Sequence, residues 1–214
     1  MTRLNFDRIA KPYRWLEYLS LGRALEHCRF HFLPQTHACR HALVLGDGDG
    51  RFTAKLLETN RAVQVDVVDI SQKMLMLLLR RSGASARRIR TYHDDALKFS
   101  YTSTGRHYDL VVTHFFLDCL TQDEVDRLIT RIQPSLANDA LWVISDFRIP
   151  GGLMRFPAQA YVGSLYLVFR WLTGLRVTRL PDYATALIGH GLRREAYNHS
   201  LAGLLTSEVW SWHD

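Results

Sequence analysis

The most informative residues of this chain form a short loop with glycine at every second position. Gly46, Gly48 and Gly50 follow an apolar run at residues 41–45 and precede a helical pattern. Glycine lets the backbone approach a bound ligand closely, and the N-terminus of a helix offers free N–H groups. In the dinucleotide-binding fingerprint G-x-G-x-x-G the third glycine would fall at position 51, which is Arg51. The spacing therefore disfavours a nicotinamide dinucleotide.

Two carboxylates follow at positions where strands of a parallel sheet would end. Asp69 comes after the apolar run at residues 63–68, and Asp95 follows the run at residues 88–93. A carboxylate at the tip of a strand can accept two hydroxyl hydrogen bonds at once, and a second carboxylate can accept an exocyclic amine. The two acids therefore suit a ligand that carries hydroxyl and amine groups.

Short β-branched runs alternate with helical patterns from residue 39 onward, as in βαβ units that feed a mostly parallel sheet. We expect strands at residues 41–45, 63–68, 88–93, 108–113, 140–145, 193–199 and 205–212. We expect helices after the glycine loop, at residues 72–81, 121–132, 156–172 and 182–190, and twice within residues 1–33. Ser71 is a predicted N-cap, and Thr121 with Glu124 a predicted capping box. The pattern predicts a doubly wound α/β fold.

The order of these motifs resembles that of the class I S-adenosylmethionine (SAM)-dependent methyltransferases. G-x-G-x-G is the glycine spacing of that family, and Val67 to Ser71 followed by Met74 looks like its second motif. Asp94-Asp95-Ala96 looks like the third motif, and Tyr108 to His114 looks like the fourth. The resemblance implies a Rossmann-like seven-stranded sheet, mostly parallel with an antiparallel last strand, flanked by helices and preceded by an N-terminal helical cap. It also implies an enzyme that uses S-adenosyl-L-methionine and releases S-adenosyl-L-homocysteine.

The resemblance assigns parts of this cofactor to particular positions. Asp69 would hold the ribose hydroxyls, Asp95 would hold the adenine amino group, and Ala96 would lie against the ring. Thr113 and His114, at the end of the fourth motif, would face the methyl group. The expected cofactor-binding residues are Tyr13, Gly46, Asp47, Gly48, Gly50, Asp69, Ile70, Met74, Asp95, Ala96, Thr113 and His114.

The methionine end of the expected site departs from the family. The family usually has an acid two positions before the first glycine, where this chain has Val44. Asp47 or Asp49 could take over its role, or both could be exposed loop acids. The opening residues 5–22 are similar to those of the ubiquinone/menaquinone-biosynthesis methyltransferases, in which a Tyr near the methionine end matches Tyr13. The alternative for Tyr13 is a half-buried aromatic that packs within the helical cap.

Methyl transfer is an in-line displacement at a sulfonium carbon, so the protein mainly aligns the reactants and excludes water. Any base is expected at the carboxyl ends of the fourth and fifth strands. His114 is the first candidate because imidazole titrates near neutrality, and lining the site without proton transfer is its alternative. Asp118 and Asp146 are the next candidates, with helix capping or a structural role as the alternative for each. Asp146 and Arg148 are expected near the substrate, or else in a structural and a solvated role respectively.

The aromatic-rich helix at residues 156–172 supplies Tyr161 and Tyr166 as candidate substrate contacts, with core packing as the alternative. In the family this segment and the N-terminal helices usually cover the substrate, so we expect a small, apolar or aromatic acceptor that reacts through O, N or C. A nucleic-acid or protein methyltransferase is the first alternative, and only the basic charge favours it. Residues 113–116 lack the Asn/Asp-Pro-Pro-aromatic clamp of DNA amino-methyltransferases, so we expect no nucleic-acid partner. A non-catalytic SAM-binding descendant is the other alternative, which Val44 keeps open.

Composition sets the remaining expectations. The 214 residues, 47% of them apolar, suit one domain, with residues 1–38 as helical cap and residues 39–214 as the SAM-binding part. Charges throughout the N-terminus and the lack of a long apolar stretch predict a cytoplasmic protein without a transmembrane segment. Three cysteines without CxxC spacing predict free thiols and no metal. The net charge of +6 permits an anionic partner. The Arg-rich run at residues 80–90 is a predicted solvated loop, with a binding patch as the alternative. The protein is expected to be a monomer or homodimer.

Overall fold

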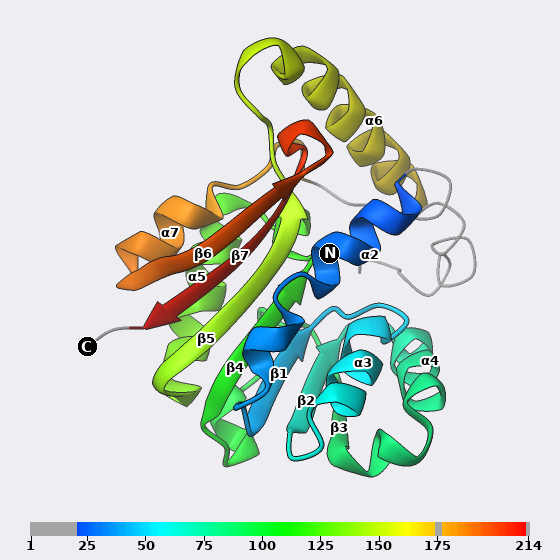
Figure 1. Cartoon of the computed structure of the whole chain (residues 1–214), viewed down its shortest axis with the longest axis vertical. Helices are drawn as coiled ribbons and strands as arrows, with labels where there is room; N and C mark the ends of the chain where they lie inside the picture. The colour runs from blue at the N-terminus through cyan, green and yellow to red at the C-terminus, as the bar shows by residue number, and fades with distance from the viewer. Residues whose placement is uncertain (1–20, 174–176, 213–214) are drawn as a thin grey trace.

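A seven-stranded sheet forms the centre of the computed structural model, which describes residues 21–173 and 177–212 (Figure 1). The strand order is β3-β2-β1-β4-β5-β7-β6, with β7 antiparallel to both of its neighbours and the other neighbouring pairs parallel. The strands are β1 (His41–Leu45), β2 (Gln64–Asp69), β3 (Ile89–His93), β4 (Tyr108–His114), β5 (Leu136–Phe147), β6 (Leu192–Ser200) and β7 (Leu205–Trp212). The expected mostly parallel, doubly wound α/β fold is confirmed.

Helices cover both faces of this sheet (Figure 1). On one face lie α2 (Gly22–Phe30), α3 (Arg51–Thr59) and α4 (Gln72–Ser82). On the other lie α5 (Gln122–Ile132) and α7 (Tyr183–Gly189). A long helix, α6 (Arg155–Thr173), extends beyond the carboxyl ends of the parallel strands. Among the described residues, no helix is both long and apolar enough to cross a membrane.

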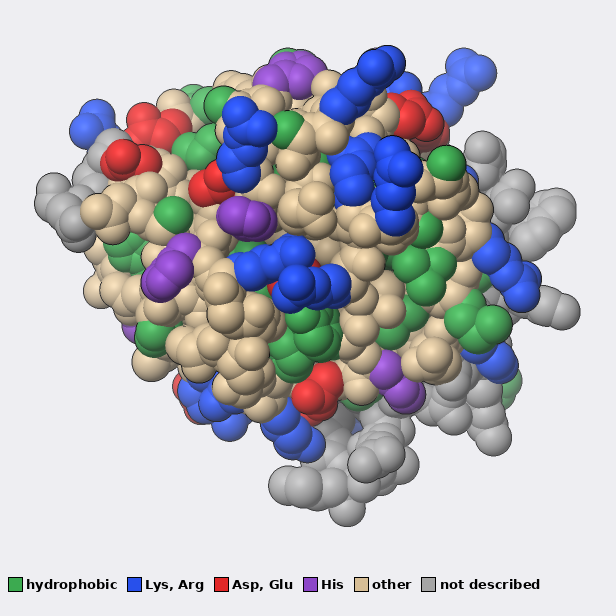
Figure 2. All heavy atoms as spheres, turned by 90° about the horizontal axis from the view of Figure 1, so that it is seen from below, with side chains coloured by type: hydrophobic (Ala, Val, Ile, Leu, Met, Phe, Trp, Pro, Cys, Tyr) green, Lys and Arg blue, Asp and Glu red, His purple; other side chains and the backbone are tan. Residues whose placement is uncertain are grey.

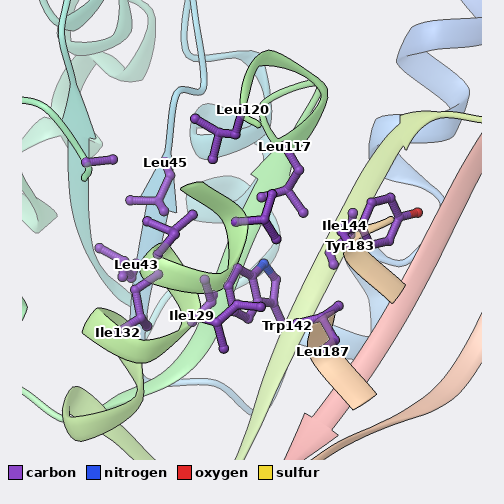
Figure 3. Packing of buried hydrophobic residues seen from close by; sticks show 14 of the residues in the cluster. Leu43, Leu45, Leu117, Leu120, Ile129, Ile132, Trp142, Ile144, Tyr183 and Leu187 are labelled. Carbon is purple, nitrogen blue, oxygen red and sulfur yellow. The ribbon is translucent and has the colours of Figure 1, made fainter. Parts of the chain in front are cut away.

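The central strands are apolar on both faces, so each face packs against helices. Successive side chains of a strand point to opposite faces, so Leu43 and Leu45 pack towards α5 while Val44 packs with Phe52 of α3. Figure 3 shows the packing on the α5 side around Trp142. Its labelled residues are Leu43, Leu45, Leu117, Leu120, Ile129, Ile132, Trp142, Ile144, Tyr183 and Leu187.

Two predicted helix starts are confirmed in atomic detail. The Ser71 side chain accepts a hydrogen bond from the Met74 backbone N–H, which begins α4 directly after β2. Thr121 and Glu124 form the capping box of α5, each side chain accepting from the backbone N–H of the other. Because such caps satisfy otherwise unpaired N–H groups, they hold both helices at the carboxyl edge of the sheet.

Two segments differ from the sequence-based expectation. β5 begins at Leu136, four residues before the predicted start at Ala140. The polar pair before Ala140 lies within the strand as an exposed irregularity instead of forming a loop, and Asp139 of this pair has a φ of +61°. Arg88 is half-buried rather than solvated, since its guanidinium donates to the carbonyls of Leu57 and Asn60. The expected free thiols of the three cysteines are confirmed, whereas the first expected N-terminal helix, with Tyr13, lies outside the described residues.

Candidate functional site

The register of the parallel strands brings the predicted site residues to one edge of the sheet. Gly46 leaves β1 directly after Leu45, whose partners are the penultimate residues of β2 and β4. Gly46 therefore lies between Asp69 at the end of β2 and His114 at the end of β4. Asp146 comes one residue beyond the β5 partner of His114. This is the edge at which ligands of open α/β sheets bind.

The glycine loop has the backbone conformation that its composition predicts. Gly46, Gly48 and Gly50 all have positive φ, a region that other residues adopt at a cost. The Gly46 N–H donates to the Val68 carbonyl, which ties the loop to β2. At Gly50 a Cβ would lie 2.5 Å from the Leu78 Cα, so this glycine also permits the close approach of α3 and α4.

Asp47 carries a buried carboxylate with spare hydrogen-bonding capacity. Its Oδ2 accepts a hydrogen bond of 2.9 Å from the Thr53 backbone N–H, while its buried Oδ1 has no hydrogen-bond partner among the described residues. Burial raises the pKa of Asp47 to about 6, against the opposing effects of the Thr53 hydrogen bond and the Arg29 charge. Asp47 is therefore a buried acid whose ionisation lowers the stability of the fold, not an exposed loop acid.

Asp49 has a different role from Asp47. Its carboxylate forms ion pairs with Arg51 at 3.2 Å and with Arg81 at 2.7 Å, and the Arg81 side chain also donates to the Asp49 carbonyl. These contacts join the glycine loop to the C-terminal end of α4. Asp49 is thus neither an exposed loop acid nor a carboxylate left over for a ligand.

The Asp69 side is fixed by the chain that follows β2. Asp69 Oδ1 accepts a hydrogen bond of 2.8 Å from the Ser71 backbone N–H, and the Asp69 carbonyl accepts one from the Asp94 N–H. The carbonyl of Ile70 lies 3.0 Å from His93 Nε2. The ends of β2 and β3 are therefore linked, and the Asp69 carboxylate is held at the sheet edge.

Asp95 and Ala96 follow β3 in a short turn. Asp95 Oδ1 accepts from the Leu97 N–H at 3.0 Å, and its other oxygen lies 3.4 Å from Lys98 Nζ. Ala96 is buried, and its carbonyl accepts a hydrogen bond of 2.7 Å from the Tyr101 hydroxyl. The acid and its small apolar neighbour thus come from one rigid turn.

His114 is buried at the end of β4 in an unusual electrostatic setting. Its ring centroid lies 4.5 Å from that of Phe52, and neither ring nitrogen has a hydrogen-bond partner in the described part of the chain. Burial and the charge of Arg29 lower the pKa of His114 well below its usual value. The imidazole is therefore neutral at neutral pH. Thr113 faces the opposite core, where its hydroxyl accepts from the Trp142 indole N–H at 3.0 Å.

Asp118 and Asp146 form a buried pair of carboxyl groups. Asp146 Oδ2 accepts from the Asp118 backbone N–H at 3.2 Å, and Asp118 Oδ1 has no partner among the residues described. Burial raises the pKa of Asp118 to about 6, and burial together with the charge of Asp118 raises the pKa of Asp146 well above its usual range. Like charges this close do not both ionise readily, so the pair holds a proton near neutral pH.

The inner side of α6 packs over this pair. The Tyr166 hydroxyl donates to the Asp118 carbonyl at 2.9 Å, and the buried Tyr161 hydroxyl has no partner within the described ranges. Arg148 lies apart from them, because its guanidinium is 3.4 Å from both His199 Nδ1 and the Gly203 carbonyl oxygen. The structure thus brings Tyr166 to the carboxyl pair, packs Tyr161 against the cluster that contains Tyr166, and directs Arg148 to the β6–β7 connection.

Sequence reasoning missed Arg29 of α2. Its side chain is buried, its guanidinium carbon lies 5.5 Å from the Phe115 ring centroid, and its charge affects the pKa of both Asp47 and His114. Phe115 itself has a φ of +52°, a strained conformation that is often found at functional sites. The sequence signal was weak, because nothing in a helix such as residues 22–30 marks one arginine as buried.

Comparison with known proteins concerns the family and the fold. Residues 43–141 match a family model described as a methyltransferase domain. The chain is 26% identical over 122 residues to a polyamine aminopropyltransferase of Prochlorococcus marinus, a match that covers 54% of this chain and 42% of that protein. The chain therefore spans less than half the length of this curated relative.

Two solved structures resemble the fold over most of both chains. The N-methyltransferase NodS of Bradyrhizobium japonicum, in complex with S-adenosyl-L-homocysteine, has a TM-score of 0.61 and 18% identity, and the match covers 90% of this chain and 85% of NodS. The 1,6-didemethyltoxoflavin-N1-methyltransferase of Burkholderia thailandensis has a TM-score of 0.68 and 18% identity, covering 96% and 84%. Neither name points to the ubiquinone/menaquinone-biosynthesis branch.

The family match and the sheet topology agree with each other. Residues 43–141 carry a methyltransferase domain, and the fold of the chain is that of the class I SAM-dependent methyltransferases, whose cofactor is S-adenosyl-L-methionine. Its fold is similar to that of two N-methyltransferases of known structure.

Proposed function

We propose that the protein transfers a methyl group from SAM to a small, apolar or aromatic acceptor through an O, N or C nucleophile. One observation carries the proposal: buried polar atoms without hydrogen-bond partners among the described residues lie beside the glycine loop. They are Asp47 Oδ1 and the two ring nitrogens of His114. Because buried polar groups in folded proteins are nearly always hydrogen-bonded, unsatisfied ones at the ligand-binding edge are suited to a polar ligand.

These residues fit the methionine end of SAM, which carries an ammonium and a carboxylate group. Val44 is buried in the core beside Phe52 and has no charge, so Asp47 takes the role of the acid that the family has there. The Asp47 carboxylate offers a counter-charge for the ammonium group. Arg29, whose charge reaches Asp47, offers one for the carboxylate. We also assign Tyr13 to this end of the site.

The nucleoside end of SAM suits the acids that follow β2 and β3. Asp69 and Asp95 each accept a backbone N–H bond, which orients the carboxylate at the sheet edge, and a carboxylate there is a suitable acceptor for the ribose hydroxyls and the adenine amine. Ile70, Met74 and Ala96 offer neighbouring backbone and apolar contacts.

When bound, SAM supplies a methyl group on a positively charged sulfur. The residues of this chain orient the acceptor, exclude water and take up its proton. We assign the proton of an O–H or N–H acceptor to the Asp118 carboxylate, whose Oδ1 has no partner among the described residues and which shares its surroundings with Asp146. His114 lines the site as a neutral imidazole, since a lowered pKa makes it a weak base. Tyr161 and Tyr166 cover the acceptor.

Calorimetry with SAM and S-adenosyl-L-homocysteine tests the cofactor assignment. We expect Asp69→Ala to weaken binding at least tenfold, because the ribose hydroxyls lose their acceptor, and the exposed α5 variant Asp123→Ala to bind as the wild type does. Equal binding by the two variants would overturn the assignment. Incubation with labelled SAM and a panel of phenols, quinols and amines, read by mass analysis, identifies the acceptor atom.

A further inference from the structure

The outer side of α6 and the turn before it expose large apolar side chains. The exposed fractions are 96% for Leu153, 77% for Phe156, 69% for Leu167 and 87% for Trp171. The last three recur at intervals of 11 and 4 residues, which places them along one side of a helix with 3.6 residues per turn. Exposed apolar patches of this kind on a protein surface mark sites of interaction.

The opposite side of the same helix is already occupied. Ala158, Val162 and Tyr166 are buried at intervals of four residues, and Val162 and Tyr166 pack in a cluster with Val177. α6 therefore carries two apolar sides, of which only one is used within the described part of the fold. The other is exposed, and α6 itself lies at the end of the molecule beyond the sheet (Figure 1).

The charge of this segment has a single sign. Residues 147–181 contain five arginines and neither Asp, Glu nor Lys. Arg155 and Arg170 of α6 are exposed, and each directly precedes an exposed aromatic residue in the sequence, Phe156 and Trp171 respectively. By contrast, the face at the amino ends of the parallel strands carries Lys and Arg interspersed with acidic and histidine side chains (Figure 2). The basic segment around α6 is thus complementary to an anionic partner.

This charge pattern distinguishes between possible partners of the exposed side. In a two-fold dimer through α6, the same surface would face itself, and two arginine-rich segments without acids would repel each other. An anionic lipid surface satisfies both features at once. Its headgroup region accepts Trp, Phe and Leu, and its phosphates attract arginine.

We propose that the outer side of α6 docks on the surface of an anionic phospholipid bilayer, with the helix lying in the plane of the interface. Phe156, Leu167 and Trp171 enter the boundary between headgroups and acyl chains, and Arg155 and Arg170 contact lipid phosphates. This is peripheral binding, since among the described residues no helix is suited to cross a membrane. The proposal goes beyond methyl transfer and does not depend on it.

Vesicle co-sedimentation of the full chain tests the proposal. We expect binding to phosphatidylcholine vesicles that contain phosphatidylglycerol and none to phosphatidylcholine alone. Phe156→Ser/Trp171→Ser should weaken binding at least tenfold. Arg155→Gln/Arg170→Gln should weaken it about 25-fold, since each basic residue near an anionic surface contributes about fivefold. The matched controls, Ile188→Ser on α7, 63% exposed, and the exposed pair Arg87→Gln/Arg90→Gln, should bind as the wild type does.

Circular dichroism checks that every variant is folded, and sedimentation velocity measures the oligomeric state. Three results would overturn the proposal. They are no binding to phosphatidylglycerol vesicles at low salt, equal binding by the α6 variants and their controls, or a dimer that Phe156→Ser dissociates, which would assign this side of α6 to a second copy of the chain.

Discussion

Replacing Asp47 with Asn tests two effects of its buried charge, the loss of folding stability and the gain in SAM affinity. Asp47 is 7% exposed, and burial raises its pKa from 3.8 to about 6. The folded protein therefore holds this proton more tightly than the unfolded chain does. The contribution of the protonated Asp47 to the free energy of unfolding is therefore complete below about pH 4 and is lost as the pH rises through about 6. Asn has nearly the same shape, can accept the same Thr53 N–H, and does not ionise.

The size of the effect follows from the pKa shift. One pKa unit corresponds to about 1.4 kcal/mol, so a shift of about two units makes the ionised Asp47 cost the cofactor-free protein about 3 kcal/mol at pH 7.5. At pH 5, where the folded carboxyl is mostly protonated, the cost is about half as large. We expect Asp47→Asn to raise the free energy of unfolding by these amounts. We expect SAM affinity to fall at least tenfold, because the ammonium group loses its counter-charge.

Urea denaturation between pH 5 and pH 8, with and without SAM, measures both effects. Asp139→Asn is the matched control, since Asp139 is exposed and its positive φ is one that Asn tolerates. Its free energy of unfolding should stay within about 0.5 kcal/mol of the wild type. A less stable Asp47→Asn protein at pH 7.5, or a difference that does not change with pH, would refute the reasoning from burial.

Two further substitutions test other parts of the site. Gly50→Ala should lower the free energy of unfolding by about 2–4 kcal/mol, because both its positive φ and the nearby Leu78 backbone oppose a Cβ. Gly105 also has positive φ but no described atom within 4 Å of a Cβ, so Gly105→Ala should lower it by only about 1–2 kcal/mol. Chemical denaturation of the two variants compares these losses. Asp118→Asn should reduce kcat/KM about a hundredfold and abolish an acidic limb near pH 6 in the rate profile, with SAM affinity unchanged. A limb that persists in the variant would assign it to another group; the control is Asp123→Asn.

Much of the fold could be predicted because its signals are local. The glycine loop, the caps at Ser71 and Thr121, and the β-branched runs each specify an element within a few residues. Parallel pairing then places the ends of successive strands at one edge, so the grouping of Asp69 and His114 follows from the order of elements. The roles of the individual residues in binding SAM remain predictions.

The remaining features depend on contacts between distant parts of the chain. The sequence places Asp47 and Asp49 in the same loop, but only packing separates a buried carboxylate from one that pairs with Arg81. The burial that keeps His114 neutral, and the presence of Arg29 beside it, likewise arise from α2 folding over the sheet edge. The helical pattern of α6 could be predicted, whereas the exposure of Phe156 could not, because an apolar side chain on a helix is usually buried.

The pairing of Asp49 with Arg81 also constrains how this chain can vary over evolution. The two residues are 32 positions apart, and the Asp49 side chain is only 15% exposed. Losing Arg81 removes one of the two ion pairs of the mostly buried Asp49 carboxylate, the other being with Arg51, so a change at one position is tolerated best together with a change at the other. Substitutions in the glycine loop are therefore expected to occur together with substitutions in the last turn of α4, a segment that a motif search confined to the loop does not include.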